Sequence, residues 1–221
     1  MDVKEMEKKI KELEKKVAVL DDLEGIRKLQ RSYGFYIEHW MYEEIIDCFS
    51  DRPDTRLNIN VGIFEGKQGI RKYFAGEKAR SADPEVQHQV MQLSGVVDVA
   101  EDGKTAEGRW YGFGMDSLPV GKCIIQNLTC GIYTAKYIKE DGKWKIHQLM
   151  WNPEIYADPS VGWVKPERRP GPTEPRTPSP VPDKPRDVNS MYPSGYVPPF
   201  HYRHPVTGKE TSPKKYGASK H

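Results

Sequence analysis

The segment Gly62-Ile-Phe-Glu-Gly-Lys-Gln-Gly-Ile-Arg-Lys-Tyr-Phe74 decides the fold when it is read together with its flanks. The alternating run Leu57–Val61 before it predicts a strand, and Gly62 is placed to turn the chain into a returning strand. The stretch Gly66–Gly76 then predicts a short helix, because its apolar residues recur at helical spacing. The segment is therefore a short hairpin followed by a short helix.

A long amphipathic helix is predicted upstream of this segment, since apolar residues recur there every three or four positions. These residues are Leu23, Ile26, Leu29, Tyr33, Ile37, Trp40 and Met41. A further helical set, Ile45 to Phe49, ends at Ser50-Asp-Arg-Pro53. Gly34 lies inside the long pattern, where glycine costs helix stability, so it indicates either close packing or a break.

Residues 1–20 form a predicted N-terminal helical extension with an apolar heptad pattern. Its members, spaced four, three, four and three residues apart, are Met6, Ile10, Leu13, Val17 and Leu20. Such a seam of little more than two heptads is too short to be stable alone. Two interpretations remain open, an extension that packs on its own domain and a seam that helps to hold an oligomer.

Four long strand-like stretches follow the short helix and predict an antiparallel meander. They are Val86–Val99, Thr105–Met115, Cys123–Ile138 and Trp144–Asn152. The turn sequences Ala100-Glu-Asp-Gly103 and Lys139-Glu-Asp-Gly142 separate the first pair and the last pair of these strands.

The composition changes after Asn152, because 15 of the 18 prolines lie from Pro153 onward. Residues 159–221 therefore predict a Pro-rich extended C-terminal arm. The arm also carries large apolar and aromatic anchors, which favour an ordered segment that wraps over its own domain or a neighbouring subunit. These anchors are Trp163, Met191, Tyr192, Tyr196, Phe200 and Tyr202.

Bulk properties exclude several classes of function. The 34 basic and 32 acidic residues give a net charge of +2, which does not favour a nucleic-acid partner. No apolar run is long enough to span a bilayer, and the N-terminus lacks the apolar core of a signal peptide. The three cysteines show no metal spacing, and nucleotide-binding fingerprints are missing. We therefore expect a cytoplasmic protein with reduced thiols, no cofactor and no metal.

The order of long helix, short hairpin, short helix and meander resembles the SnoaL-like branch of the NTF2-like superfamily, which includes the bile-acid and scytalone dehydratase type proteins. The motifs Gly108-Arg-Trp-Tyr111 and Asp141-Gly-Lys-Trp-Lys-Ile146 add to the resemblance, which covers residues 21–158. It implies an α+β fold, a cone-shaped barrel whose curved antiparallel sheet wraps on the long N-terminal helix. Proteins of this branch hold one small molecule in the mouth of the barrel.

The resemblance also implies four catalytic candidates. His88 lies early in the first meander strand, about two residues from where the dehydratases place their histidine, and imidazole suits acid/base work near neutral pH. Tyr33 and Glu38 match a helix tyrosine followed five residues later by an acid. The dehydratases carry an Asp at the position of Gly114, and Asp116 keeps the same strand parity two residues further on.

Substrate-binding candidates come from the same comparison. Trp110 and Tyr111 must face opposite sides of the strand, and the family pattern implies that Trp110 is the inward one and forms a pocket wall. Asn127 offers an inward amide on the third meander strand if its parity, and not that of Gln126, points inward. Trp151 lies near the expected mouth and Asn152 is a hydrogen-bond donor at the strand end.

These residues predict a cofactor-independent lyase, of the dehydratase or isomerase kind or cleaving C–C bonds as in deformylation. It would act by general acid/base chemistry on a small hydrophobic or aromatic substrate. Glu154 stands where the dehydratase pattern has an Arg, which favours a different substrate class. The alternative is a non-catalytic ligand-binding or assembly module, and a third class is an accessory subunit of an oxygenase. We expect a homo-oligomer, a dimer or trimer, with no nucleic-acid or membrane partner.

Overall fold

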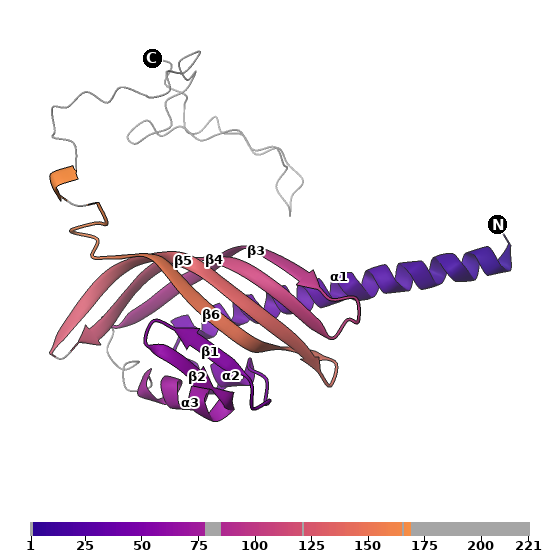
Figure 1. The fold of residues 1–221 in the computed structure, drawn as a ribbon, viewed down its shortest axis with the longest axis horizontal. Helices are drawn as coiled ribbons and strands as arrows, with labels where there is room; N and C mark the ends of the chain where they lie inside the picture. Colours follow the sequence, from indigo (N-terminus) through magenta and orange to yellow (C-terminus); the bar gives the residue numbers. More distant parts are fainter. Residues whose placement is uncertain (1, 78–84, 121, 165, 169–221) are drawn as a thin grey trace, which may run out of the picture. The chain divides into compact units, whose positions relative to one another are not determined.

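One long helix and a six-stranded sheet make up most of the residues described by the computed structural model, which are 2–77, 85–120, 122–164 and 166–168 (Figure 1). The elements in chain order are α1 (Val3–Glu38), α2 (Tyr42–Asp47), β1 (Arg56–Ile59), β2 (Gly62–Glu65), α3 (Gly66–Glu77), β3 (Gln87–Val99), β4 (Thr105–Val120), β5 (Cys123–Glu140), β6 (Lys143–Ala157) and the 3₁₀ turn η2 (Pro166–Arg168). Most of the predicted arm lies outside the described residues.

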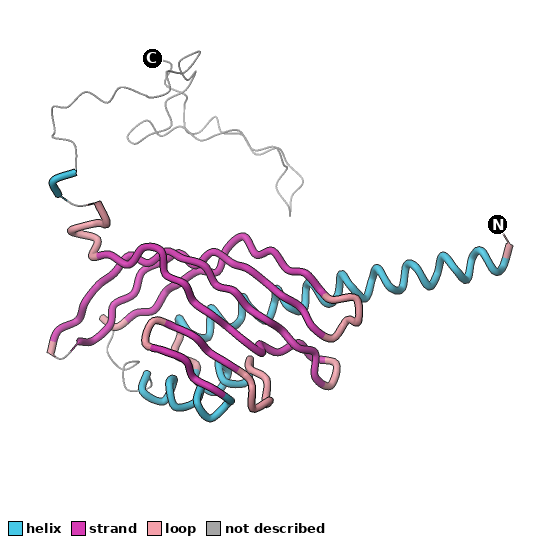
Figure 2. Tube along the Cα trace, in the orientation of Figure 1, coloured by secondary structure: helices cyan, strands magenta, loops and turns pink. Residues whose placement is uncertain are grey.

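The sheet has the strand order β2-β1-β6-β5-β4-β3 and stays open. Its neighbours are antiparallel except for β1 and β6, which run parallel. The strands curve over α1, while α2 and α3 lie on the same side of the sheet as α1 (Figure 2). We call this side the inner face and the opposite side the outer face. The α+β fold with a curved sheet on a long N-terminal helix is thus confirmed.

Helix α1 runs without a break through the predicted N-terminal extension and the predicted long amphipathic helix. Asp2 caps its first turn by accepting a hydrogen bond from the Glu5 amide at 2.8 Å. Gly34 does not break it. A Cβ at Gly34 would lie 3.5 Å from Gln92 Nε2 on β3, so this glycine allows close packing of helix and sheet. None of the described helices is both long and apolar enough to cross a membrane.

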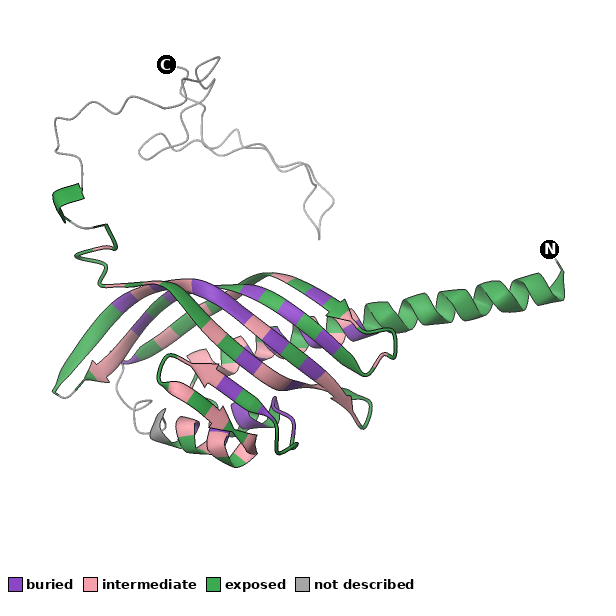
Figure 3. Cartoon of the chain, in the orientation of Figure 1, coloured by how far each residue is buried: buried purple, intermediate pink, exposed green. Residues whose placement is uncertain are grey.

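Side-chain burial alternates along the sheet, as the striped strands in Figure 3 show. The alternation is strict along the first part of β4, but it shifts where β3 and β6 carry irregular register. On β6, Ile146 pairs with Tyr137 and Gln148 pairs with Lys136, so His147 is an extra residue. Such a bulge reverses the parity of every residue that follows it. Leu149 therefore shares the inner face with Ile146.

A buried hydrogen-bond chain holds α1 against three strands. The Trp110 indole donates to the Tyr137 hydroxyl at 3.0 Å, and that hydroxyl donates to Gln30 Oε1 at 2.6 Å. Gln30 in turn donates to Gln92 on β3. A Cβ at Gly95 would lie 2.1 Å from the Trp110 ring, so only glycine leaves room for the indole there. Trp110 is therefore a core anchor between α1 and the sheet.

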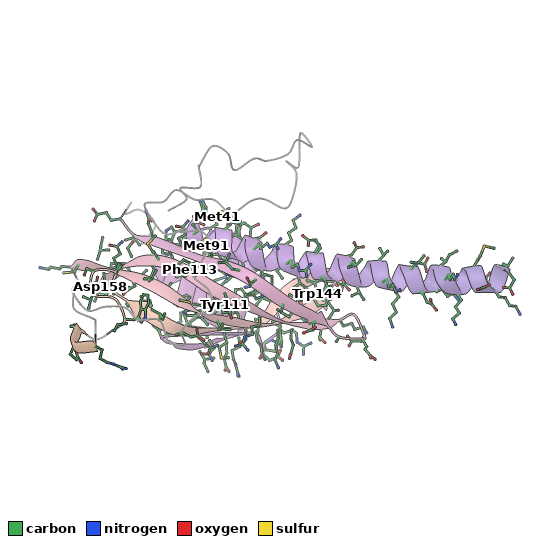
Figure 4. The ribbon with its side chains drawn as sticks, turned by 90° about the horizontal axis from the view of Figure 1, so that it is seen from above. Met41, Met91, Tyr111, Phe113, Trp144 and Asp158 are labelled. Carbon is green, nitrogen blue, oxygen red and sulfur yellow. The ribbon has the colours of Figure 1, made fainter. Side chains whose placement is uncertain are left out.

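Two surfaces keep apolar side chains exposed. On the outer face, Met91, Tyr111 and Phe113 point away from the helices (Figure 4). In register these residues lie on neighbouring strands, because Met91 pairs with Phe113 across β3 and β4. The second surface is the N-terminal half of α1, where every described residue before Asp22 is exposed (Figure 3).

Candidate functional site

A cavity of about 550 Å³ lies between the inner face and the helices. Most of its lining is apolar or aromatic and comes from helices and strands alike, which is typical of small-molecule sites. The main apolar and aromatic residues are Tyr33, Ile37, Trp40, Ile45, Leu57, Phe64, Tyr73, Phe74, Val90, Tyr133 and Trp151. The polar lining residues include His88, Asp116, Thr129 and Tyr156. A few polar groups therefore converge in an otherwise apolar space.

His88 and Asp116 are directly opposite each other on β3 and β4. Both line the cavity, so both side chains are on the inner face. Directly opposed residues of an antiparallel pair have Cβ atoms about 5 Å apart, which brings an imidazole and a carboxylate within interaction range. The Trp40 ring stands edge-on to His88, with 6.3 Å between the ring centroids. The register thus places His88 beside Asp116 on the lining of the cavity, and we call these two residues the His–Asp couple.

Asp116 is held by two donors. Asn127, its direct neighbour across β4 and β5, donates from Nδ2 to Asp116 Oδ1 at 3.0 Å. The Tyr156 hydroxyl donates to the same oxygen at 3.0 Å. Asp116 is only 4% exposed, and these bonds fix its orientation. Burial and the neighbouring Asp116 charge raise the pKa of Tyr156 to about 12, so its hydroxyl keeps its proton at physiological pH.

Tyr33 brings a second phenol to the cavity from α1. It is 3% exposed and stands edge-on to Phe49, with 5.7 Å between ring centroids. Burial raises the pKa of Tyr33 well above its usual value. The side chain is therefore a neutral hydrogen-bond donor. Deeper in the lining, Tyr133 and Trp151 overlap at 4.3 Å between centroids and form an aromatic wall.

The structure brings together four of the predicted site residues, since Tyr33, His88, Asp116 and Trp151 all line the cavity. Asn127 joins them through its bond to Asp116.

Three predicted site residues lie elsewhere. Glu38 accepts a hydrogen bond from Gln89 Nε2 at 3.0 Å near the end of α1, outside the lining. Trp110 faces inward as expected, but its ring fills the core slot beside Gly95. Asn152 is exposed, with Nδ2 3.4 Å from the Ile132 carbonyl oxygen, because the bulge at His147 turns it away from the inner face.

Tyr156 is a site residue that strict alternation misses. It is five positions from Trp151, an odd spacing that predicts opposite faces. The register shifts between Pro153 and Ile155, so that Tyr156 pairs with Thr129 and both residues line the cavity. The proline in this strand is the sequence signal for the irregularity.

Trp40 was predicted as part of the helical pattern, but it ends the helix. The Trp40 amide donates to the Ile37 carbonyl and the Met41 amide to the Tyr36 carbonyl, which is a Schellman motif. Trp40 has φ 54°, the left-handed conformation that this position usually gives to glycine. Trp40 thus keeps a left-handed conformation at a position that lines the cavity, which makes a role for its ring a hypothesis to test.

Trp40→Gly is expected to weaken the binding of a flat aromatic probe such as 2-naphthol by about 10-fold, because one face of the stacking contact is lost. The melting temperature should change little, since relief of about 1–2 kcal/mol of left-handed strain offsets the lost ring contacts. Fluorescence titration and thermal unfolding measure the two effects. Unchanged naphthol affinity would show that the ring does not contact the ligand.

A family model described as a SnoaL-like domain matches residues 18–150, more than half of the chain. The chain belongs to the SnoaL-like family. The match spans α1 from its middle, the hairpin, α3 and the meander as far as the middle of β6, so it includes His88 and Asp116. No curated protein matches this SnoaL-like chain.

Solved structures share the fold at low identity. A protein from Novosphingobium aromaticivorans described as a candidate scytalone dehydratase has 16% identity and a TM-score of 0.55, covering 71% of this chain and 99% of its own. The hexachlorocyclohexane dehydrochlorinase LinA-type3 from Novosphingobium barchaimii has 16% identity and a TM-score of 0.52, with 68% and 99% coverage. A candidate aromatic ring hydroxylase from N. aromaticivorans has 21% identity and a TM-score of 0.52, with 62% and 91% coverage. These similarities establish the fold of this SnoaL-like protein.

Proposed function

We propose that this protein is a cofactor-independent lyase that removes a proton from a small hydrophobic or aromatic substrate. The observation that carries the proposal is the direct pairing of His88 with Asp116 on the wall of a largely apolar cavity. Two Novosphingobium proteins with this fold are named as a candidate dehydratase and a dehydrochlorinase, so the fold accommodates elimination chemistry.

In the proposed step, His88 takes a proton from a carbon of the substrate as general base. The C–H electron pair forms the new double bond, and the leaving group departs with its bonding electrons. Asp116 stabilises the imidazolium that forms, because opposite charges attract strongly in a buried site. The low dielectric of the apolar lining increases this effect.

The two phenols supply the complementary acid function. The Tyr156 hydroxyl is 3.0 Å from Asp116 Oδ1, so it lies beside the couple, and Tyr33 enters the cavity from α1. The Tyr33 hydroxyl can donate a hydrogen bond to a departing oxygen or halide, whereas the Tyr156 hydroxyl can do so only by giving up its bond to Asp116. Trp40, Tyr133 and Trp151 provide flat surfaces for an aromatic substrate. This set of groups fits elimination without an added cofactor.

Proton abstraction can be tested without knowledge of the natural substrate. The protein is incubated in deuterium oxide with a panel of small aromatic compounds that carry an acidic C–H next to a carbon bearing a hydroxyl or halide group. We expect at least one compound to exchange its C–H for deuterium or to lose the leaving group, as followed by proton NMR. Compounds that bind in the cavity, shown by quenching of tryptophan fluorescence, but never exchange would instead establish a ligand-binding module.

We also propose that the protein is a homo-oligomer. The exposed apolar residues on α1 support this, because an apolar stripe along a helix is stabilised when a partner covers it.

A further inference from the structure

The N-terminal half of α1 carries an apolar seam that stays exposed among the residues that the structure describes. The seam comprises Val3, Met6, Ile10, Leu13, Val17 and Leu20, whose exposed fractions run from 40% to 66%. The next two positions of the heptad pattern hold the charged residues Glu24 and Arg27, so the apolar seam ends where the helix reaches its domain. This half of α1 extends beyond the sheet in Figure 1.

The seam also points away from the domain. The residues by which α1 packs on the sheet are Asp22, Ile26, Gln30 and Tyr33. Leu20 and Asp22 are two residues apart, which on a helix of 3.6 residues per turn places them about 200° apart. A second helix can therefore lie along the seam without meeting the sheet that α1 supports.

The choice of residues at the seam favours a two-stranded parallel coiled coil. In heptad notation, Val3, Ile10 and Val17 occupy position a, and Met6, Leu13 and Leu20 occupy position d. β-Branched residues at a with leucine at d are the combination that favours parallel dimers over trimers.

The flanking charges select a parallel partner of identical sequence. The e positions are all acidic, with Glu7, Glu14 and Asp21, whereas Lys9 and Lys16 occupy g positions. In a parallel dimer each g residue meets the e residue five positions later on the partner, which pairs Lys9 with Glu14 and Lys16 with Asp21. In an antiparallel dimer e would meet e and g would meet g, so like charges would face each other.

We infer that residues 3–20 pair with the same segment of a second copy to form a short, parallel, in-register coiled coil. A free peptide of this length would not hold a helix. Here the helix is already nucleated, because α1 continues into the part of the domain fixed by the buried Gln30 and Tyr33. The inference is independent of the chemistry of the cavity.

Disulfide trapping at the N-terminal end tests both the pairing and its direction. Val3→Cys and Leu20→Cys are prepared in the full-length Cys123→Ser protein, since Cys123 is the exposed native thiol among the described residues. In the parallel arrangement Val3→Cys crosslinks to itself under mild oxidation. In an antiparallel arrangement the two copies of residue 3 would be about 25 Å apart, at 1.5 Å per residue. Crosslinking only in a mixture of the two variants would then overturn the parallel coil.

Disruption of the seam supplies the second arm of the test. Adding Ile10→Glu and Leu13→Glu to the Val3→Cys protein should abolish the crosslink and raise any dimer dissociation constant by more than about 100-fold, because four apolar side chains lose their contacts. The matched control, Lys8→Glu with Lys15→Glu, changes the outward f positions and should crosslink as before. An equal crosslink yield in both double variants, or no crosslink in any protein, would overturn the inference. Circular dichroism checks that the domain stays folded.

Discussion

His88→Ala is expected to lower the rate of C–H exchange or elimination by about 10²- to 10⁴-fold, the range usually lost with a general base. The loss should appear in kcat with little change in the affinity for substrate, because the ring acts on the reacting proton while the aromatic wall provides most of the binding. His88 is half-buried at the cavity, so its removal should leave the melting temperature nearly unchanged. Proton NMR on the compounds that react with the wild-type protein measures the rate.

Gln87→Ala is the matched control, because Gln87 precedes His88 on β3 and its side chain is exposed. Asp116→Asn tests the other half of the couple and should reduce the rate less than His88→Ala, since Asp116 acts through the imidazole. If His88→Ala reacts as fast as the Gln87→Ala control, His88 is not the base and the lyase proposal fails. Retained binding of 2-naphthol would then favour the ligand-binding module.

Gly114→Asp is expected to destabilise the protein by more than about 4 kcal/mol, or to prevent folding, although it recreates the family position expected to hold an acid. A Cβ at Gly114 would lie 1.8 Å from the carbonyl oxygen of Gln89 and 2.9 Å from the Cα of Val90. Both atoms belong to the backbone of β3, so no rotation of a side chain can relieve the clash. The backbone of β3 therefore excludes an acid from position 114, and the proposed couple relies on Asp116.

Gly34→Ala provides the contrast. A Cβ there would meet only the Gln92 side chain at 3.5 Å, an ordinary contact, and alanine is the better helix former by about 1 kcal/mol. We expect Gly34→Ala to keep or raise the melting temperature, while Gly114→Asp lowers it or yields insoluble protein. Denaturant unfolding of both variants measures the difference. Gly114→Asp with wild-type stability would show that β3 and β4 are not as closely paired as described.

The sequence was sufficient for the fold because its signals agree at every level. Helical spacing over α1, the turn at Gly62 and the hairpin sequences at Gly103 and Gly142 each indicate one structure. The pairing of His88 with Asp116 does not follow from the hairpin alone, because the irregularity between Leu93 and Val96 shifts the register of β3 and β4 by one residue. Without that shift His88 would lie opposite Ser117.

What the sequence could not supply lies at the irregular positions. The bulge at His147 exposes Asn152, and the shift after Pro153 brings Tyr156 to the cavity. Neither irregularity can be recognised from the alternation of apolar and polar residues along the strand. Trp110 was expected in the pocket, and its side chain does point to the inner face. Its ring packs beside Gly95 of β3 instead, and this contact between two strands has no signal in the sequence around Trp110.

The continuity of α1 has a mechanical consequence. Tyr33 at the cavity and Met6 near the N-terminus lie on one helix, about 40 Å apart at 1.5 Å per residue. A tilt of α1 by roughly 5° about Tyr33, as a bound molecule could impose, would displace Met6 by about 3.5 Å along an arm of that length. A small tilt of α1 at the cavity would therefore be amplified at the far end of the helix.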